Sequence, residues 1–254
     1  MAGMFVSSVS VQQELISAAE RDRWPFTMPC VAAIARDGLE LKCPVTFLVG
    51  ENGSGKSTLV EAIAEAFGLD ARGGRAGRKY GNNRDKTPLG TVLRLGLTRD
   101  GAKMKSGARS RQKGYFLRAE TTFGFAEVVS GMPGYWAENL DERSHGEGFL
   151  VIFESMFNAP GLYLMDEPEA ALSFRSCLRL VALMHQLGES GAQVICATHS
   201  PILASLPGAD IIEVGEHGYR RAAWSDLDLT DHWRRYLANP QVYLRRLLEP
   251  ASSP

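Results

Sequence analysis

The segment from Gly50 to Thr58, with the sequence Gly-Glu-Asn-Gly-Ser-Gly-Lys-Ser-Thr, constrains this chain more than any other. It matches the phosphate-binding loop pattern of Gly, four residues, Gly, Lys and then Ser or Thr. An apolar, β-branched run at 45–49 precedes it and predicts a buried strand. Apolar residues at helical spacing over 58–67 predict a helix that ends at Gly68. This order of strand, loop and helix predicts an α/β fold built around a phosphate site.

The chemistry of phosphate binding explains the residue types in this loop. Glycines allow successive backbone N–H groups to point toward phosphate oxygens, and the N-terminus of the next helix adds a partial positive charge. Lys56 adds a full charge for the outer phosphates, and the Ser57 hydroxyl is a ligand for Mg²⁺. We therefore expect ATP and Mg²⁺ as cofactors. The residues expected to contact the nucleotide are Asn52, Gly53, Ser54, Gly55, Lys56, Ser57 and Thr58.

Composition is typical of a globular protein, with 44% hydrophobic and 22% charged residues among 254. No run approaches the roughly 18 apolar residues that cross a bilayer. The first residues lack the features of a signal peptide, and the four cysteines form no CxxC pair. These features predict one cytoplasmic domain over 1–254, without a transmembrane segment and with reduced thiols.

Charge is unevenly distributed along the chain. Residues 71–118 contain 14 Lys or Arg and two acids, a balance of +12, so the remainder carries −13 for a net charge of −1. Most of these basic residues lie in two stretches expected to be loops, at 70–88 and 99–113. The asymmetry predicts an anionic partner for the basic loops at 71–113. Nucleic acid is the leading candidate, and solvated loops without such a partner or an unknown protein partner with an acidic surface stay open as alternatives.

The pattern of strands and helices predicts a mainly parallel sheet flanked by helices on both faces. Strands are expected at 91–98, 114–120, 162–165, 193–197 and 210–214, with helices at 121–129, 146–158 and 169–187.

The two ends of the chain predict additional elements. A short helix is expected at 9–19, and a hairpin at Asp37-Gly38 adds an N-terminal antiparallel β region. Between the two ends, residues 71–160 are expected to form the basic loops and a small helical lobe. The tail at 224–254 is expected to form helices that pack on the body.

A second part of the site follows the strand at 162–165. Asp166 and Glu167 come directly after this buried strand, which is the Walker B arrangement. Asp166 is expected to hold Mg²⁺, and Glu167 to orient and deprotonate the attacking water.

With both elements present, the chain resembles the ABC-type ATPases over nearly its whole length, and especially the small bacterial stand-alone ATPases of that superfamily. The resemblance implies a P-loop NTPase fold, ATP hydrolysis and a homodimer that closes around two Mg-ATP. It also implies that His199, which follows the next strand, is the switch histidine that contacts the γ-phosphate. The expected catalytic residues are therefore Lys56, Glu167 and His199.

The resemblance further implies a signature segment that caps the γ-phosphate bound by the opposite protomer. The matching stretch is 143–147, in which Ser144 offers a hydroxyl and Gly146 a backbone N–H. It departs from Leu-Ser-Gly-Gly-Gln at three positions, and a helix N-cap at Ser144 is the alternative interpretation. The glutamine that normally contacts the metal is not apparent. Glu120 is expected to replace it as a magnesium ligand, and contact of Arg118 with phosphate or with a partner is the alternative.

Three functions are compatible with these motifs. The leading one is an ATP hydrolase that dimerises and couples hydrolysis to an unidentified partner. The alternative is the energy subunit of a membrane transporter, which the degenerate signature and missing glutamine disfavour. An ATP-binding switch with negligible turnover is disfavoured by Glu167. Either Trp24 or Phe26 could stack on adenine, although a core position is the more common role for such residues.

Overall fold

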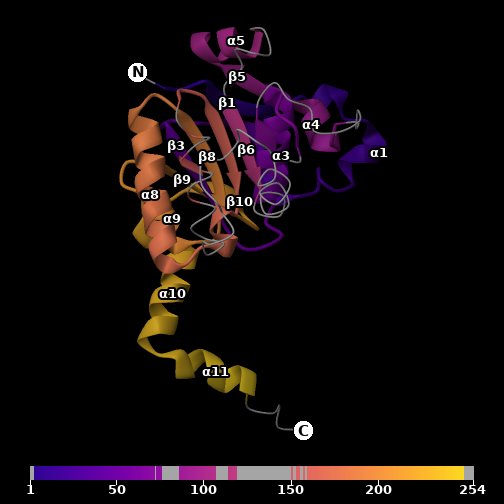
Figure 1. Cartoon of the computed structure of the whole chain (residues 1–254). Coiled ribbons are helices and arrows are strands. Elements are labelled where there is room, and N and C mark those ends of the chain that lie inside the picture. Colours follow the sequence, from indigo (N-terminus) through magenta and orange to yellow (C-terminus); the bar gives the residue numbers. More distant parts are fainter. Residues whose placement is uncertain are drawn as a thin grey trace, which may run out of the picture.

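The structure is a computed structural model, and it describes residues 3–71, 73–75, 86–106, 114–118, 150, 153–154, 157 and 159–248. A seven-stranded sheet forms its centre (Figure 1). Across the sheet the strands are β10 (Gly218–Arg221), β9 (Asp210–Gly215), β3 (Val45–Val49), β8 (Gln193–Thr198), β7 (Leu162–Asp166), β6 (Gly114–Arg118) and β4 (Gly74–Arg75). The five inner strands are parallel and the two edge strands are antiparallel. The expected α/β fold with a mainly parallel sheet is confirmed.

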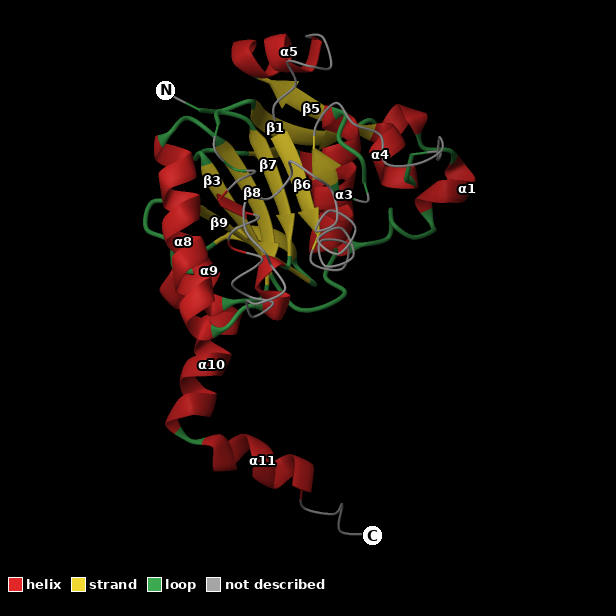
Figure 2. Ribbon diagram, in the orientation of Figure 1, coloured by secondary structure: helices red, strands yellow, loops and turns green. Residues whose placement is uncertain are grey.

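Side chains on the two faces of this sheet enter two separate cores, as the period of two in a strand requires. Leu48 packs in one core, whereas its neighbours Phe47 and Val49 pack in the other. The first core lies under the helices α2 (Pro29–Asp37), α3 (Lys56–Phe67) and α4 (Pro88–Val92). The second lies under α8 (Phe174–Glu189) and α9 (Pro201–Ala204) (Figure 2).

A small antiparallel sheet carries the N-terminal part of the chain. It contains β2 (Leu39–Glu40), β1 (Val6–Val11) and β5 (Leu93–Leu97). The fully buried side chain of Gln193 joins this sheet to the main one, because it accepts from the N–H groups of Phe5 and Val6 at 2.8 Å and donates to the Val6 carbonyl at 2.7 Å. The expected antiparallel β region is therefore present.

The predicted helix at 9–19 and the predicted hairpin at Asp37-Gly38 are both wrong. Residues 9–11 belong to β1, and short helical turns follow at Gln13–Leu15 and in α1 (Ala18–Arg21). Asp37 ends α2, which starts at Pro29, and Gly38 caps it with a φ of 69°. A glycine beyond a helix end and a glycine in a hairpin both need positive φ, so the dipeptide alone did not distinguish them.

Two other predicted elements differ from the structure, and one observed strand was not predicted. The expected loop at 99–113 begins with the helix α5 (Arg99–Ser106). The expected helix at 169–187 is divided into a 3₁₀ turn at Pro168–Ala171 and α8, whose N-cap is the Ser173 side chain. The strand β10 was not expected. The predicted helix at 121–129 lies outside the described residues, as does most of the predicted helix at 146–158.

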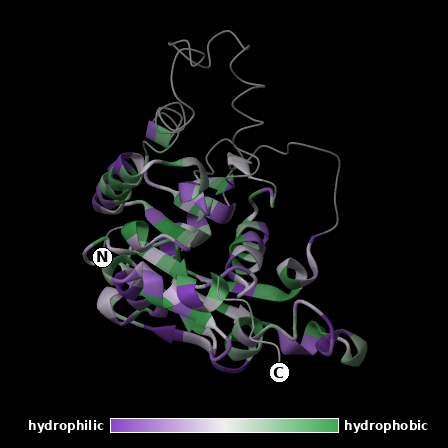
Figure 3. Ribbon diagram, turned by 90° about the horizontal axis from the view of Figure 1, so that it is seen from below, coloured by the Kyte–Doolittle hydropathy of each residue, from purple (hydrophilic) through white to green (hydrophobic). Residues whose placement is uncertain are grey.

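The tail helices pack on the body only at the start of the first one, where Leu229 contacts the core and Thr230 is buried. The two helices are α10 (Asp228–Ala238) and α11 (Pro240–Leu248), and Figure 1 shows α11 well below the sheet. Leu237, Leu247 and Leu248 are each at least 70% exposed. Figure 3 shows hydrophobic colour both on the strands of the body and on these tail helices. In the described part of the chain, no helix has the length and apolarity needed to span a bilayer.

Candidate functional site

The phosphate-binding loop connects β3 to α3, as the sequence predicted. Gly50 passes so close to β9 that a Cβ would lie 2.2 Å from the Val214 carbonyl oxygen. Gly55 adopts a φ of 104°, and a Cβ there would lie 2.6 Å from the Cys30 sulfur. Side chains at either position would push the loop away from its supports.

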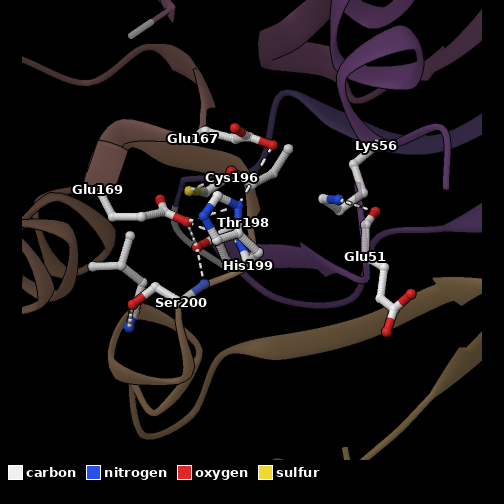
Figure 4. Close-up of polar contacts among 10 residues, drawn as sticks. Glu51, Lys56, Glu167, Glu169, Cys196, Thr198, His199 and Ser200 are labelled. Atoms are coloured by element: carbon white, nitrogen blue, oxygen red, sulfur yellow. Dashed lines mark hydrogen bonds and ion pairs between the residues drawn. The ribbon is translucent and has the colours of Figure 1, made fainter. Parts of the chain in front are cut away.

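Lys56 occupies the first turn of α3 and is almost fully buried. Its Nζ donates to the Glu51 carbonyl at 2.7 Å, which closes the loop on itself (Figure 4). Burial lowers the pKa of Lys56, and the carboxylates of Glu167, Asp166 and Glu169 oppose this shift. The ammonium group therefore lies in the field of acidic groups from the end of β7.

Asp166 is the last residue of β7 and is 7% exposed. Burial raises the pKa of its carboxyl group, whereas a hydrogen bond from the Ser57 side chain and the charge of Arg118 lower it. The Arg118 Nε lies 3.9 Å from Asp166 Oδ2, and the same guanidinium forms an ion pair with Glu61. Ser57 and Asp166, two of the three predicted protein ligands for magnesium, are therefore neighbours.

Glu167 follows at a bend in the backbone. Its φ of 49° is the one positive value among the non-glycine residues that the structure describes. Its N–H donates to the Ala197 carbonyl at 2.9 Å, which ties the bend to β8. The carboxylate is partly exposed, and its Oε1 lies 3.5 Å from His199 Nδ1.

Glu169 is a site residue for which the sequence predicted no role. Its buried Oε1 accepts from the Thr198 hydroxyl at 2.5 Å and from the His199 N–H at 2.9 Å (Figure 4). The same oxygen lies 3.7 Å from His199 Nδ1. Glu169 thus fixes the segment that carries His199. The sequence did contain one signal for this residue. Glu169 is an acid two residues after Asp166-Glu167, in a segment that is otherwise small and apolar.

A cleft of about 950 Å³ opens beside the phosphate-binding loop. Its walls come from Gly50–Ser54, from Met28 and Pro29, from the turn between β9 and β10, from His199 and from α10. This volume is within the usual range for sites that bind small molecules. The phosphate-binding loop and His199 therefore share one open cavity, whereas Lys56, Asp166 and Glu167 are not among its lining residues.

Two family models match separate parts of the chain. The model described as "AAA domain" matches residues 35–120, and the model described as "AAA domain, putative AbiEii toxin, Type IV TA system" matches residues 148–205. The first includes the phosphate-binding loop, and the second includes Asp166, Glu167 and His199. Both models describe AAA domains, and each matches less than half of the chain.

The curated relatives of this chain are distant. The ribose import ATP-binding protein RbsA 1 of Streptomyces avermitilis is 29% identical over 68% of this chain and 36% of the relative. The zinc import ATP-binding protein ZnuC of Yersinia enterocolitica is 28% identical over 67% of this chain and 65% of the relative. The chain thus spans only about a third of RbsA 1 and less than two thirds of ZnuC.

Solved structures with a similar chain path are also distant in sequence. CbiO1 of Clostridium perfringens, described as part of the ABC transporter complex CbiONQ, has 16% identity and a TM-score of 0.45, covering 82% of this chain and 90% of that chain. The SMC head domain of Thermotoga maritima has 16% identity and a TM-score of 0.44, covering 73% and 92%.

The residues of the site fit a magnesium ion at Asp166. Its Oδ1 is buried and has no hydrogen-bond partner among the described residues. A bound cation would be the missing partner of this oxygen. No group of three or more ligating side chains gathers anywhere in the described ranges. The remaining coordination would therefore come from phosphate and water, as is usual for Mg²⁺.

The other expected site residues lie outside the described residues. These are Ser144 and Gly146 of the signature-like segment, and Glu120 as the third metal ligand. The expected site residues that the fold brings together are the loop at 52–58 with Asp166, Glu167 and His199.

Proposed function

We propose that this domain binds Mg-ATP at the phosphate-binding loop and hydrolyses it. The observation that carries the proposal is that Lys56, Asp166, Glu167 and His199 come together where the neighbouring parallel strands β3, β7 and β8 end. Backbone N–H groups of the loop and Lys56 bind the phosphates. When bound, Mg²⁺ would neutralise charge on the outer phosphates, with Ser57 and Asp166 as its protein ligands.

Glu167 is the general base in this proposal. Its carboxylate takes a proton from the attacking water, and His199, 3.5 Å away, holds that water and the γ-phosphate in line. Glu169 orients His199 through its backbone and is a positioning residue.

The active form in this proposal is a homodimer with two Mg-ATP between its protomers. Ser144 and Gly146 of one protomer cap the γ-phosphate bound by the other, and Glu120 completes the metal site. ATP then stabilises the closed dimer because both protomers contact it, and hydrolysis removes this contact. The partner whose state this cycle changes is nucleic acid or a protein that binds at 71–113.

A transporter energy subunit is the second candidate, since the curated relatives include import ATP-binding proteins. One experiment addresses both candidates: ATP hydrolysis by the purified chain, measured alone and with DNA, RNA or liposomes. Stimulation by nucleic acid supports the first candidate, and stimulation only by liposomes that contain a membrane partner supports the second. Lys56→Ala should abolish hydrolysis and ATP binding; hydrolysis by this variant at the wild-type rate would contradict the proposal.

A further inference from the structure

The cleft beside the phosphate-binding loop extends away from Asp166 and Glu167. β3 lies between β8 and β9, and the Walker B strand β7 lies beyond β8. The walls made by the β9–β10 turn and α10 are on the opposite side of β3. A triphosphate with its outer phosphate near Asp166 and Glu167 would therefore direct its nucleoside toward this second half of the cleft.

The start of α10 is firmly attached to the sheet. Glu213 on β9 is 3% exposed, and its Oε1 accepts from the Asp228 N–H at 2.8 Å. Its other oxygen binds Arg220 at 2.6 Å, and Leu227 is fully buried. The first turn of α10 is thus fixed in place relative to the phosphate-binding loop.

Three residues of α10 at helical spacing face the cleft, namely Leu229, His232 and Trp233. Trp233 is 47% exposed, so part of its indole ring is available to a ligand. Met28 lies in the cleft wall formed at the start of α2 and is partly buried against the core. An aromatic ring and a polarizable thioether are suited to a flat, apolar ring.

We propose that Trp233 and Met28 hold the nucleobase of the bound nucleotide. The inference rests on the proposed function, because it assigns the other end of the same ligand. It also replaces the aromatic residues that the sequence suggested. Trp24 and Phe26 are both described, and neither is among the residues that line this cleft; Phe26 instead packs against the core.

The test compares two ligands that differ only in the nucleoside. Binding of ATP and of inorganic tripolyphosphate, each with magnesium, is measured by calorimetry for the wild type, Trp233→Ala, Trp233→Phe and Trp24→Ala. Loss of a base–aromatic stack weakens binding by roughly tenfold or more. We expect Trp233→Ala to lower the affinity for ATP by that factor and to leave the affinity for tripolyphosphate unchanged. Trp233→Phe and Trp24→Ala should bind ATP with the affinity of the wild type.

Several results would overturn this assignment of the base. They are wild-type ATP affinity in Trp233→Ala, equal weakening of both ligands, or selective loss of ATP affinity in Trp24→Ala. Because Trp233 is half exposed, its replacement should leave the thermal unfolding midpoint near that of the wild type, which confirms that the variant is folded. A wild-type chain that binds neither ligand would instead contradict the proposed function itself.

Discussion

Glu167 has a backbone conformation that a glutamate seldom adopts. A non-glycine residue in the left-handed region is strained by about 1–3 kcal/mol, and such strain persists only where the surroundings enforce it. Here the hydrogen bond to the Ala197 carbonyl and the buried strand β7 enforce it. The result is a carboxylate directed at His199 before any ligand binds.

Glu167→Gln should therefore retain ATP binding and lose turnover. The amide has nearly the same shape as the carboxylate but cannot accept the proton from water, so the rate of hydrolysis should fall about 100-fold or more. Steady-state hydrolysis and equilibrium ATP binding measure the two effects. Glu189→Gln, an exposed position on α8, is the control. Unchanged hydrolysis in Glu167→Gln would remove Glu167 as the base.

Glu169 allows a test of positioning with a built-in rescue. Glu169→Leu removes the acceptor for Thr198 and for the His199 N–H, and it should lower kcat about tenfold to a hundredfold with a smaller change in KM. Glu169→Gln keeps an acceptor oxygen at the same place and should restore most of kcat. Equal loss of kcat in both variants would show that the charge of Glu169, and not its hydrogen bonds, is needed.

At the scale of elements, Gln193 is the main polar link between the two sheets. Gln193→Leu would leave two buried N–H groups and one buried carbonyl without partners, at a cost of about 3 kcal/mol or more in the free energy of unfolding. Chemical denaturation measures this loss. Thr46→Val is the matched control, because the Thr46 hydroxyl is buried without a partner among the described residues and its removal should be nearly neutral. Similar losses in both variants would contradict the role of Gln193.

The inner strands and the phosphate-binding loop could be predicted because their signals are local and strong. Five buried apolar runs became five parallel strands within a residue or two of their expected limits. Elements at the edge of the fold were harder, because their signals are ambiguous. The β1 strand has buried residues at Val6, Val9 and Val11, a spacing that mixes strand and helix periods.

The candidate site was predicted to the extent that its residues lie in contiguous motifs. Lys56, Asp166 and Glu167 are examples. Glu169 and Trp233 were missed for a different reason: each reaches the site through the folding of distant segments. Glu169 contacts residues 29 and 30 positions away, and Trp233 shares a cleft with a loop about 180 residues earlier. No local pattern records such contacts.

At the scale of the whole molecule, the proposed homodimer should depend on ATP. Glu167→Gln cannot consume the ligand, so it should accumulate as a dimer with ATP and magnesium and remain a monomer without them. Size-exclusion chromatography with light scattering measures the mass directly. Lys56→Ala should remain a monomer under both conditions. A Glu167→Gln chain that stays monomeric at saturating ATP would contradict the dimeric site.

The projection of α10 and α11 from the body has a mechanical consequence. The first turn of α10 is held at the sheet by Glu213, while its last turn carries α11 and the exposed Leu237, Leu247 and Leu248. An 11-residue helix is about 16 Å long, so a tilt of about 10° at its fixed end would move its free end by about 3 Å, and α11 further still. A small shift of Trp233 would therefore become a larger displacement of α11. A molecule bound to these exposed leucines would therefore be displaced when the cleft becomes occupied.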